Sequence, residues 1–281
     1  MDIRAYAKIN LCLNIDGVYN DRMHHVDMVL QEITLYDSLT VDRSESGITV
    51  TSDVILPPVN TASRAAEEFF SFTGALGGAK IDIQKNIPSM AGLGGGSSDA
   101  AAVINALDDL YGTGLGTEDK VRIAIKVGSD VPFFIKGGCA RVSGRGDELA
   151  PVQNKLDPYI VLAKPESGVS TAEAYRLYDA MPNRGALVVD VIEFLEAGDM
   201  VGYAGTAGNS LYRPAMVLNR DVRKVASLFT DADFSMMTGS GSCVFAMYKG
   251  EDAAVSALER AEKDELVTFC RLVRKADRAV V

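Results

Sequence analysis

The sequence has few of the residues that form disulfide-bonded or zinc-bound scaffolds. Its only histidines are the neighbours His24 and His25, which would point to opposite faces of a strand and cannot form an H-x-x-x-H zinc site. Four cysteines occur in 281 residues, none in a C-x-x-C pair, and their spacing is too wide for a disulfide framework. They are Cys12, Cys139, Cys243 and Cys270. A disulfide-rich secreted protein and a zinc enzyme are both disfavoured.

Positive charge and long apolar runs are also scarce. The chain has 28 Lys and Arg against 38 Asp and Glu, which gives a formal net charge of −10. Non-specific nucleic-acid binding needs basic surface, so we expect no nucleic-acid partner. No run of 18 apolar residues and no charged start followed by an apolar stretch is present. We therefore expect no membrane span, no signal peptide and a cytoplasmic location. The negative net charge still allows a local basic site that binds a phosphorylated small molecule.

The remaining composition is that of a folded globular protein. Hydrophobic residues make up 47% of the chain and charged residues 23%, which excludes a disordered protein. A length of 281 residues predicts one large or two modest domains. The hydrophobic pattern resets near residues 147–151, so we predict one domain of residues 1–148 and another of 149–281. We expect a monomer or a homodimer.

Both strand and helix periodicities occur, which predicts an α+β protein. Alternating apolar residues at 9, 11, 13 and 15 predict a strand, and two further strand-like runs, 26–35 and 39–50, follow with a turn at 44–47. A helix is predicted over 61–72 with Thr61 as its cap, and another over 117–127 that ends at Gly128. Later segments are a strand over 159–163 and helices near 171–178, 188–197 and 221–229.

The strongest local signal is a glycine-rich run between an alternating strand, 80–85, and an amphipathic helix. Four of the five positions 92–96 are glycine, and Ser97 and Ser98 follow. Glycine permits positive φ and close backbone approach, and the free N–H groups at the start of a helix bind phosphate. A flexible linker is the alternative, but a linker would not stand directly between a strand and a helix. The run is therefore predicted to be a phosphate-binding loop.

The common phosphate and nucleophile motifs do not match this loop. A Walker A loop requires a Gly-Lys pair, which occurs nowhere in the chain. The dinucleotide fingerprint fits Gly92 and Gly94 but meets Ser97 at its third glycine. No G-x-S-x-G nucleophile elbow is present. The loop therefore belongs to another class of phosphate binder.

Two charged residues are candidates for catalysis. Asp130 lies between the helix-ending Gly128 and a Val-Pro pair, so we expect it on a stiff extended loop, as a general base or as a simple turn aspartate. Lys8 lies on the first strand, where its stem can pack while its ammonium reaches a cleft. An exposed edge-strand lysine is the alternative. Asn10 shares the face of Lys8 and could contact the same substrate.

The segment from Pro88 to Ser98 resembles the phosphate loop of the GHMP kinases. Residues 7–11, 128–134 and 238–245 are similar to three further motifs of that family, in the same order and over almost the whole chain. They resemble the branch whose acceptor is a cytidine diphosphate-linked methylerythritol. The resemblance implies a two-domain GHMP kinase fold, with an N-terminal ribosomal-protein-S5-like domain and a C-terminal α/β sandwich. It also implies phosphoryl transfer from ATP to the 2-hydroxyl of the acceptor, in non-mevalonate isoprenoid synthesis.

The resemblance also implies roles for individual residues. Lys8 and Asp130 match catalytic positions, and Asn60 and Lys85 match positions of the adenine pocket, where the pattern alone suggests a turn asparagine and a solvated lysine. The loop residues implied to bind ATP are Pro88, Ala91, Gly92, Leu93, Gly94, Gly95, Gly96, Ser97 and Ser98. The residues implied to bind the acceptor are Asn10, His24, His25, Thr171, Tyr175, Gly239 and Ser240. Phosphoryl transfer needs Mg²⁺, for which Ser98 is a candidate ligand that could instead cap its helix.

The chain departs from the family at its first hairpin. The family shows Asp-Gly-Tyr-His where this chain has Arg22-Met23-His24-His25. On this alignment His25 reads the cytosine, His24 fills the aromatic position, and Met23 replaces the glycine. A base sandwiched between His24 and Tyr175 is then expected. The departure leaves open a GHMP kinase with another small alcohol as its acceptor; a non-catalytic nucleotide-binding regulator is a further alternative, although it would be expected to lack Lys8 or Asp130.

Overall fold

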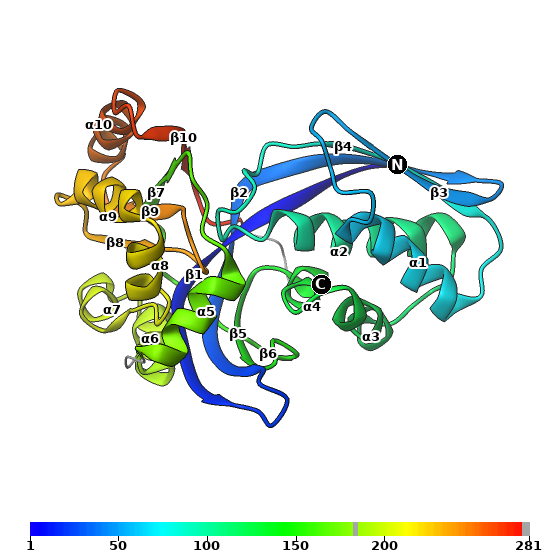
Figure 1. Cartoon of the computed structure of the whole chain (residues 1–281), viewed down its shortest axis with the longest axis horizontal. Coiled ribbons are helices and arrows are strands. Elements are labelled where there is room, and N and C mark those ends of the chain that lie inside the picture. The colour runs from blue at the N-terminus through cyan, green and yellow to red at the C-terminus, as the bar shows by residue number, and fades with distance from the viewer. Residues whose placement is uncertain (182–184, 277–281) are drawn as a thin grey trace.

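Two β-sheets organise the protein in a computed structural model that describes residues 1–181 and 185–276 (Figure 1). The first sheet has six strands in the order β3-β4-β2-β5-β6, with β1 paired to β2. Its strands are β1 (Asp2–Val18), β2 (His24–Ser44), β3 (Gly47–Ser52), β4 (Gly78–Gln84), β5 (Cys139–Gly144) and β6 (Glu148–Pro151). The second sheet has the order β10-β7-β9-β8. Its strands are β7 (Tyr159–Pro165), β8 (Phe234–Met237), β9 (Val244–Tyr248) and β10 (Val267–Val273).

The helices form two sets along the chain, although the helix Val188–Ala197 of the second set contacts β1 and β2 of the first sheet. Figure 1 shows the first four helices together beneath the first sheet, and the long β1–β2 hairpin running between them and the C-terminal elements. The first set is α1 (Thr61–Thr73), α2 (Gly95–Tyr111), α3 (Thr117–Val127) and α4 (Val131–Lys136). The second set is α5 (Thr171–Ala180), α6 (Val188–Ala197), α7 (Met200–Thr206), α8 (Tyr212–Leu218), α9 (Arg220–Ala226), a 3₁₀ turn (Ser227–Phe229) and α10 (Glu251–Glu262). No helix of the described ranges is long and apolar enough to span a bilayer.

Strand β1 is buried on both faces, which the alternating pattern did not predict. Ile9 and Leu11 pack into the core shared with the C-terminal half. Their polar neighbours Lys8 and Asn10 are also buried, at 3% and 1% exposure. Polar residues on a doubly covered strand must face an internal site or a polar partner, because burial without one is costly. The strand therefore brings polar groups to the junction of the two halves.

Three predicted boundaries differ from the structure. The two predicted runs 26–35 and 39–50 form one strand, β2, up to Ser44, because residues 36–38 continue the ladder with β1. Helix α1 is capped by Asn60 rather than Thr61: the Asn60 side chain accepts from Ser63 N–H, and the Ser63 hydroxyl accepts from Asn60 N–H. The predicted domain boundary at 148/149 falls inside β6, which pairs with β5 of the first sheet.

Candidate active site

A cavity of about 1180 Å³ lies where the two halves meet. Segments far apart in sequence line it: the β1–β2 hairpin, the glycine-rich loop, the Asp130 turn, helix α5 and the loop after β8. The predicted site residues that line it are Lys8, Asn10, His24, Lys85, Pro88, Ala91, Gly92, Leu93, Gly94, Gly95, Gly96, Ser97, Asp130, Thr171, Tyr175, Gly239 and Ser240. Three predicted residues, Asn60, Ser98 and His25, do not line it. Most of the predicted site is thus brought to one place.

The glycines of the loop are required for different reasons. Gly92 and Gly94 adopt φ of +73° and +74°, and Gly94 is the N-cap of α2. A Cβ on Gly92 would lie 2.2 Å from the carbonyl oxygen of Thr238, so the loop touches the C-terminal glycine motif backbone to backbone. Gly95 is not left-handed; a Cβ there would lie 2.9 Å from Ile87 Cγ2. The loop leaves the first N–H groups of α2 at the cavity wall, which suits phosphate.

Lys85 lies in a buried ion cluster and is not a solvated strand-end lysine. Its Nζ donates to Asp37 Oδ2 and, at 2.7 Å, to Asp99 Oδ2. Asp37 Oδ1 also accepts the backbone N–H groups of Asn86 and Ile87, at 2.6 and 2.8 Å. Asp37 and Asp99 are 0% and 4% exposed, and the cluster joins β2, the start of the phosphate loop and α2. Burial raises the pKa of Asp99 to about 7, against the opposing effect of Lys85.

Lys8 and Asp130 form the charged pair of the cavity. Lys8 Nζ lies 3.9 Å from Asp130 Oδ2 and donates to Asn10 Oδ1 at 2.5 Å. Burial lowers the pKa of Lys8, and the Asp130 carboxylate opposes this shift. A buried ammonium with few protein acceptors is a strong electrostatic partner for a ligand anion. The pair therefore combines a proton acceptor with a fixed positive charge.

The conformation of Asp130 differs from the extended loop that we expected. Asp130 has φ −87° and ψ −12° and is the N-cap residue of the short helix α4. Pro132 lies in the first turn of α4, where its missing N–H has no helical partner to lose. Proline here begins a helix, although the pattern suggested that it would exclude one. Asp130 is consequently held by a helix start and not by an extended strand.

The acceptor end of the cavity joins the two halves of the chain. Thr171 and Ser240, from α5 and the loop after β8, have their hydroxyls 2.7 Å apart. Thr238 Oγ1 accepts the backbone N–H of Asn10 at 2.9 Å. Burial, together with the Asp130 charge, raises the pKa of Tyr175, which also lines the cavity. The predicted substrate residues from both halves therefore meet.

The first hairpin shows that our alignment to the family motif was displaced by one residue. Arg22, not Met23, has the left-handed φ of +68° that favours glycine. Arg22 therefore replaces the glycine of Asp-Gly-Tyr-His, Met23 replaces the tyrosine, and His24 is the histidine. His24 lines the cavity, whereas His25 does not and instead contacts Asp16 through Nδ1. The assignment of His25 as the residue that reads the base was wrong, because alternation along β2 turns it away.

The expected sandwich of a base between His24 and Tyr175 also does not fit the structure. The two ring centroids are 4.6 Å apart, with an interplanar angle of 36°. An interposed ring needs a separation of at least about 7 Å, two contact distances of about 3.5 Å. Tyr175 therefore packs on His24 itself, which leaves no space for a base between the two rings.

Comparisons with known proteins agree with this arrangement. The pattern described as "GHMP kinases N terminal domain" matches residues 60–138, and "GHMP kinases C terminal" matches residues 192–266. The 4-diphosphocytidyl-2-C-methyl-D-erythritol kinase of Desulfitobacterium hafniense is 38% identical over 258 residues, which cover 90% of this chain and 89% of that protein. The chain belongs to the GHMP kinase family.

Further relatives place this GHMP kinase in one branch. The protein of the same name from Alkaliphilus metalliredigens is 37% identical over 272 residues, covering 92% of this chain and 91% of its own. A solved 4-(cytidine 5'-diphospho)-2C-methyl-D-erythritol kinase superposes with a TM-score of 0.82 and 30% identity, over 99% of this chain and 100% of that one. The two-domain GHMP kinase fold predicted from the sequence is therefore confirmed.

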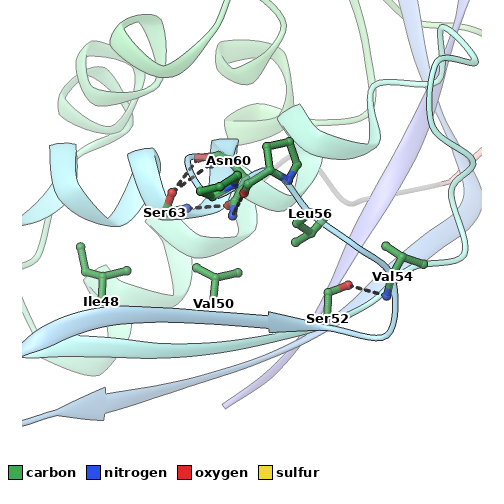
Figure 2. A pocket seen from close by; sticks show the side chains of 9 residues that line it. Ile48, Val50, Ser52, Val54, Leu56, Asn60 and Ser63 are labelled. Atoms are coloured by element: carbon green, nitrogen blue, oxygen red, sulfur yellow. Dashed lines mark hydrogen bonds between the residues drawn. The ribbon is translucent and has the colours of Figure 1, made fainter.

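A second pocket of about 250 Å³ lies beside the phosphate loop of this GHMP kinase (Figure 2). Figure 2 shows Ile48 and Val50 pointing from β3 toward Asn60 and Ser63 at the start of α1. The Thr61 hydroxyl donates to Gly96 O at 2.6 Å, which joins the start of α1 to the phosphate loop. The Asn60 side chain is engaged as the helix cap and also donates to Pro57 O at 3.3 Å. Ile48 and Val50 make part of the β3 side of the pocket apolar, and Ser52 of the same strand also lines it.

The site offers few ligands to a metal ion. Among residues 1–181 and 185–276, no group of three or more His, Cys, Asp or Glu side chains could enclose one. Mg²⁺ suits such a site, because it keeps several waters and binds through one or two protein oxygens and substrate phosphates. Asp130 and Ser97 line the cavity, whereas Ser98 does not and is only 2% exposed. The structure thus fits a phosphate-bound Mg²⁺ but gives Ser98 no place at the cavity.

Proposed function

We propose that this GHMP kinase transfers the γ-phosphoryl group of ATP to the 2-hydroxyl of 4-diphosphocytidyl-2-C-methyl-D-erythritol. The observation that carries the proposal is the Lys8–Asp130 pair, 3.9 Å apart, facing a cavity that the phosphate loop also lines. A carboxylate can act as the base, and an ammonium and a helix N-terminus can stabilise the charge of a transferring phosphoryl group. The names of the relatives supply the acceptor.

The proposed mechanism uses Asp130 as the base. Its carboxylate takes the proton of the acceptor hydroxyl as that oxygen bonds to the γ-phosphorus and the bond to the β-phosphate oxygen breaks, releasing ADP. Lys8, held by Asn10, stabilises the charge that develops on the transferred group. Gly239 lies close to the Lys8 ammonium: a Cβ there would stand 3.3 Å from Lys8 Nζ. Because glycine has no Cβ, this space stays free for phosphate oxygens.

We place the phosphates of ATP at the start of α2 and its adenine in the pocket between β3 and α1. The Thr61–Gly96 hydrogen bond joins the start of α1, which lines the pocket, to the phosphate loop. A nucleotide with its base in the pocket can therefore place its phosphates near the backbone N–H groups at the start of α2. Bound Mg²⁺ would neutralise charge on the phosphate oxygens, with Ser97 at the cavity wall as a candidate oxygen donor. Lys85 supports this region from beneath through its two carboxylate partners.

The acceptor's base is assigned to the His24 and Tyr175 end of the cavity. Tyr175 packs on His24, and Thr171, one turn earlier on α5, lines the same cavity with its hydroxyl 2.7 Å from that of Ser240. The product would serve non-mevalonate isoprenoid synthesis. All four cysteines are unpaired, which supports the proposed cytoplasmic location. A monomer or homodimer stays a prediction, for light scattering to measure.

A coupled ADP-release assay tests the proposal. We expect activity with the cytidine diphosphate-linked acceptor and little with mevalonate or homoserine, each supplied with ATP and Mg²⁺. The Asp130→Asn variant is the control for contaminating ATPase. Activity with mevalonate or homoserine in place of the cytidine acceptor would favour a GHMP kinase for another small alcohol. No activity with any alcohol, with ATP binding retained, would favour the regulator.

A further inference from the structure

We propose that Asp179 is a positioning residue that fixes the tautomer of His24, so that His24 Nδ1 accepts a hydrogen bond from the exocyclic amine of cytosine. This inference deepens the proposed function and rests on it. It assigns the choice of cytosine over uracil to a carboxylate on α5 that faces the first hairpin. Asp179 therefore acts through His24.

The geometry brings three side chains together at the edge of the cavity. His24 Nε2 lies 2.7 Å from Asp179 Oδ1, and the imidazole stacks on Tyr175 with a centroid distance of 4.6 Å. Tyr175 and Asp179 are four residues apart on α5, so one helix face supplies both contacts. The His24 side chain is 12% exposed, and all three residues line the cavity. The imidazole is thus held by its face and by one of its nitrogens.

The chemistry of the contact decides which nitrogen carries the proton. An ionised carboxylate can only accept a hydrogen bond, so Nε2 must donate. In a neutral imidazole the other nitrogen, Nδ1, then has a lone pair and is an acceptor. Among the hydrogen bonds formed by described residues, none reaches His24 Nδ1. The structure therefore leaves Nδ1 as an acceptor with no hydrogen-bond partner among the described residues, on a side chain that lines the cavity.

A fixed acceptor distinguishes the two pyrimidines. Cytosine carries an amine donor at C4, whereas uracil has a carbonyl acceptor at the equivalent position. An acceptor at Nδ1 pairs with the first and repels the second. A site with a fixed hydrogen-bonding group rejects the analogue that cannot satisfy it, because a buried polar group is left unpaired. If the His24 ring could rotate or exchange tautomers freely, Nδ1 would not stay an acceptor, and the discrimination between cytosine and uracil would be lost.

The experiment compares the full-length wild type with Asp179→Asn at pH 8, where imidazole is neutral. An asparagine can turn its NH₂ group toward Nε2, which moves the imidazole proton to Nδ1 and makes that nitrogen a donor. Acceptors are the cytidine diphosphate-linked substrate and its uridine analogue, scored by kcat/KM. Histidine ¹⁵N spectra of the free enzyme report the protonated nitrogen directly, and only His24 and His25 contribute signals.

The chain provides a matched control. His25 Nδ1 contacts Asp16, which is a second histidine–carboxylate pair one residue along, outside the cavity. Asp16→Asn should change the His25 spectrum and leave the choice of base unchanged. Asp179→Ala is the second variant: it frees Nε2 without supplying a donor, so both tautomers should be present. Circular dichroism checks that each variant is folded.

The expected results are specific. The wild type should prefer the cytidine acceptor by about 5- to 150-fold, the discrimination typical of a base-edge hydrogen bond. Asp179→Asn should show a proton on His24 Nδ1 and lose at least about fivefold of that preference, partly through a gain for the uridine analogue. Asp179→Ala should lie between the two.

Two results would overturn the inference alone. The first is an unchanged preference although the spectrum shows the proton moved to Nδ1, because the base would then not read that nitrogen. The second is a wild-type spectrum with the proton already on Nδ1. In both, the wild type still phosphorylates the cytidine acceptor, so the proposed function stands. A wild type inactive with that acceptor would instead refute the proposed function, and this inference with it.

Discussion

Lys85→Met should destabilise the folded protein strongly, because Lys85 is the cation between two buried carboxylates. The substitution keeps most of the side-chain volume but leaves Asp37 and Asp99, at 0% and 4% exposure, facing each other. Removing one partner of a buried ion pair costs about 3–5 kcal/mol. At roughly 2–4 °C per kcal/mol for a protein of this size, the melting temperature should fall by roughly 6–20 °C. ATP affinity should also fall, since the cluster holds the start of the phosphate loop.

The stability lost in Lys85→Met should increase with pH. The pKa of Asp99 is raised from 3.8 to about 7 in the folded protein. A raised pKa means that folding favours the protonated carboxyl. The contribution of Asp99 to the free energy of unfolding is therefore fully present below about pH 4 and is lost as pH rises through 7. Without the Lys85 ammonium, which lowers the pKa of Asp99, that pKa rises further. The defect of Lys85→Met should therefore be largest at pH 8 and smaller at pH 6.

Thermal unfolding at pH 6 and pH 8 and calorimetric titration with ATP measure both effects. Lys120→Met is the matched control: Lys120 Nζ lies 2.7 Å from Asp108, another carboxylate of α2, at the end of the helix far from the loop. Asp108 keeps its bonds from Thr113 and Leu115, so the control should lose less stability and bind ATP normally. A Lys85→Met protein as stable as the wild type at pH 8, with only ATP affinity lost, would refute the structural role of the cluster.

Two further variants test the catalytic pair and the loop. Asp130→Asn should lower kcat by about 10²–10⁴-fold with ATP affinity by calorimetry nearly unchanged, because it removes the base and leaves the phosphate loop intact; retention of half the activity would contradict this. Gly92→Ala combines a left-handed φ with a contact of 2.2 Å to Thr238 O, whereas Gly112→Ala has the same strain and open space around it. Gly112→Ala should cost about 1–2 kcal/mol in unfolding experiments, and Gly92→Ala should cost more and raise KM for ATP. Equal effects of the two glycine variants would show that the contact with Thr238 does not matter.

Local chemistry was enough to predict several parts of this kinase. The turn from Gly92 into helix α2 could be predicted because glycine permits the left-handed φ that Gly92 and Gly94 adopt; phosphate binding by this loop stays a prediction. Helices α1, α3 and α6 followed from periodicity, since each buries one stripe. Asp130 was found from its neighbours, although Pro132 begins a helix there and does not prevent one.

Which polar groups meet could be seen only in the folded chain. Asp37 is 48 residues from Lys85, and Asp179 is 155 residues from His24, so no local pattern marks either carboxylate as a partner. Asp37 continues strand β2 where the pattern suggested a break, because its charge is compensated by Lys85 and two backbone N–H groups. The alignment of the first hairpin was likewise settled by one backbone angle, the φ of +68° at Arg22. Local sequence sets how each segment folds, but contacts between segments depend on packing across the two sheets, which no single segment encodes.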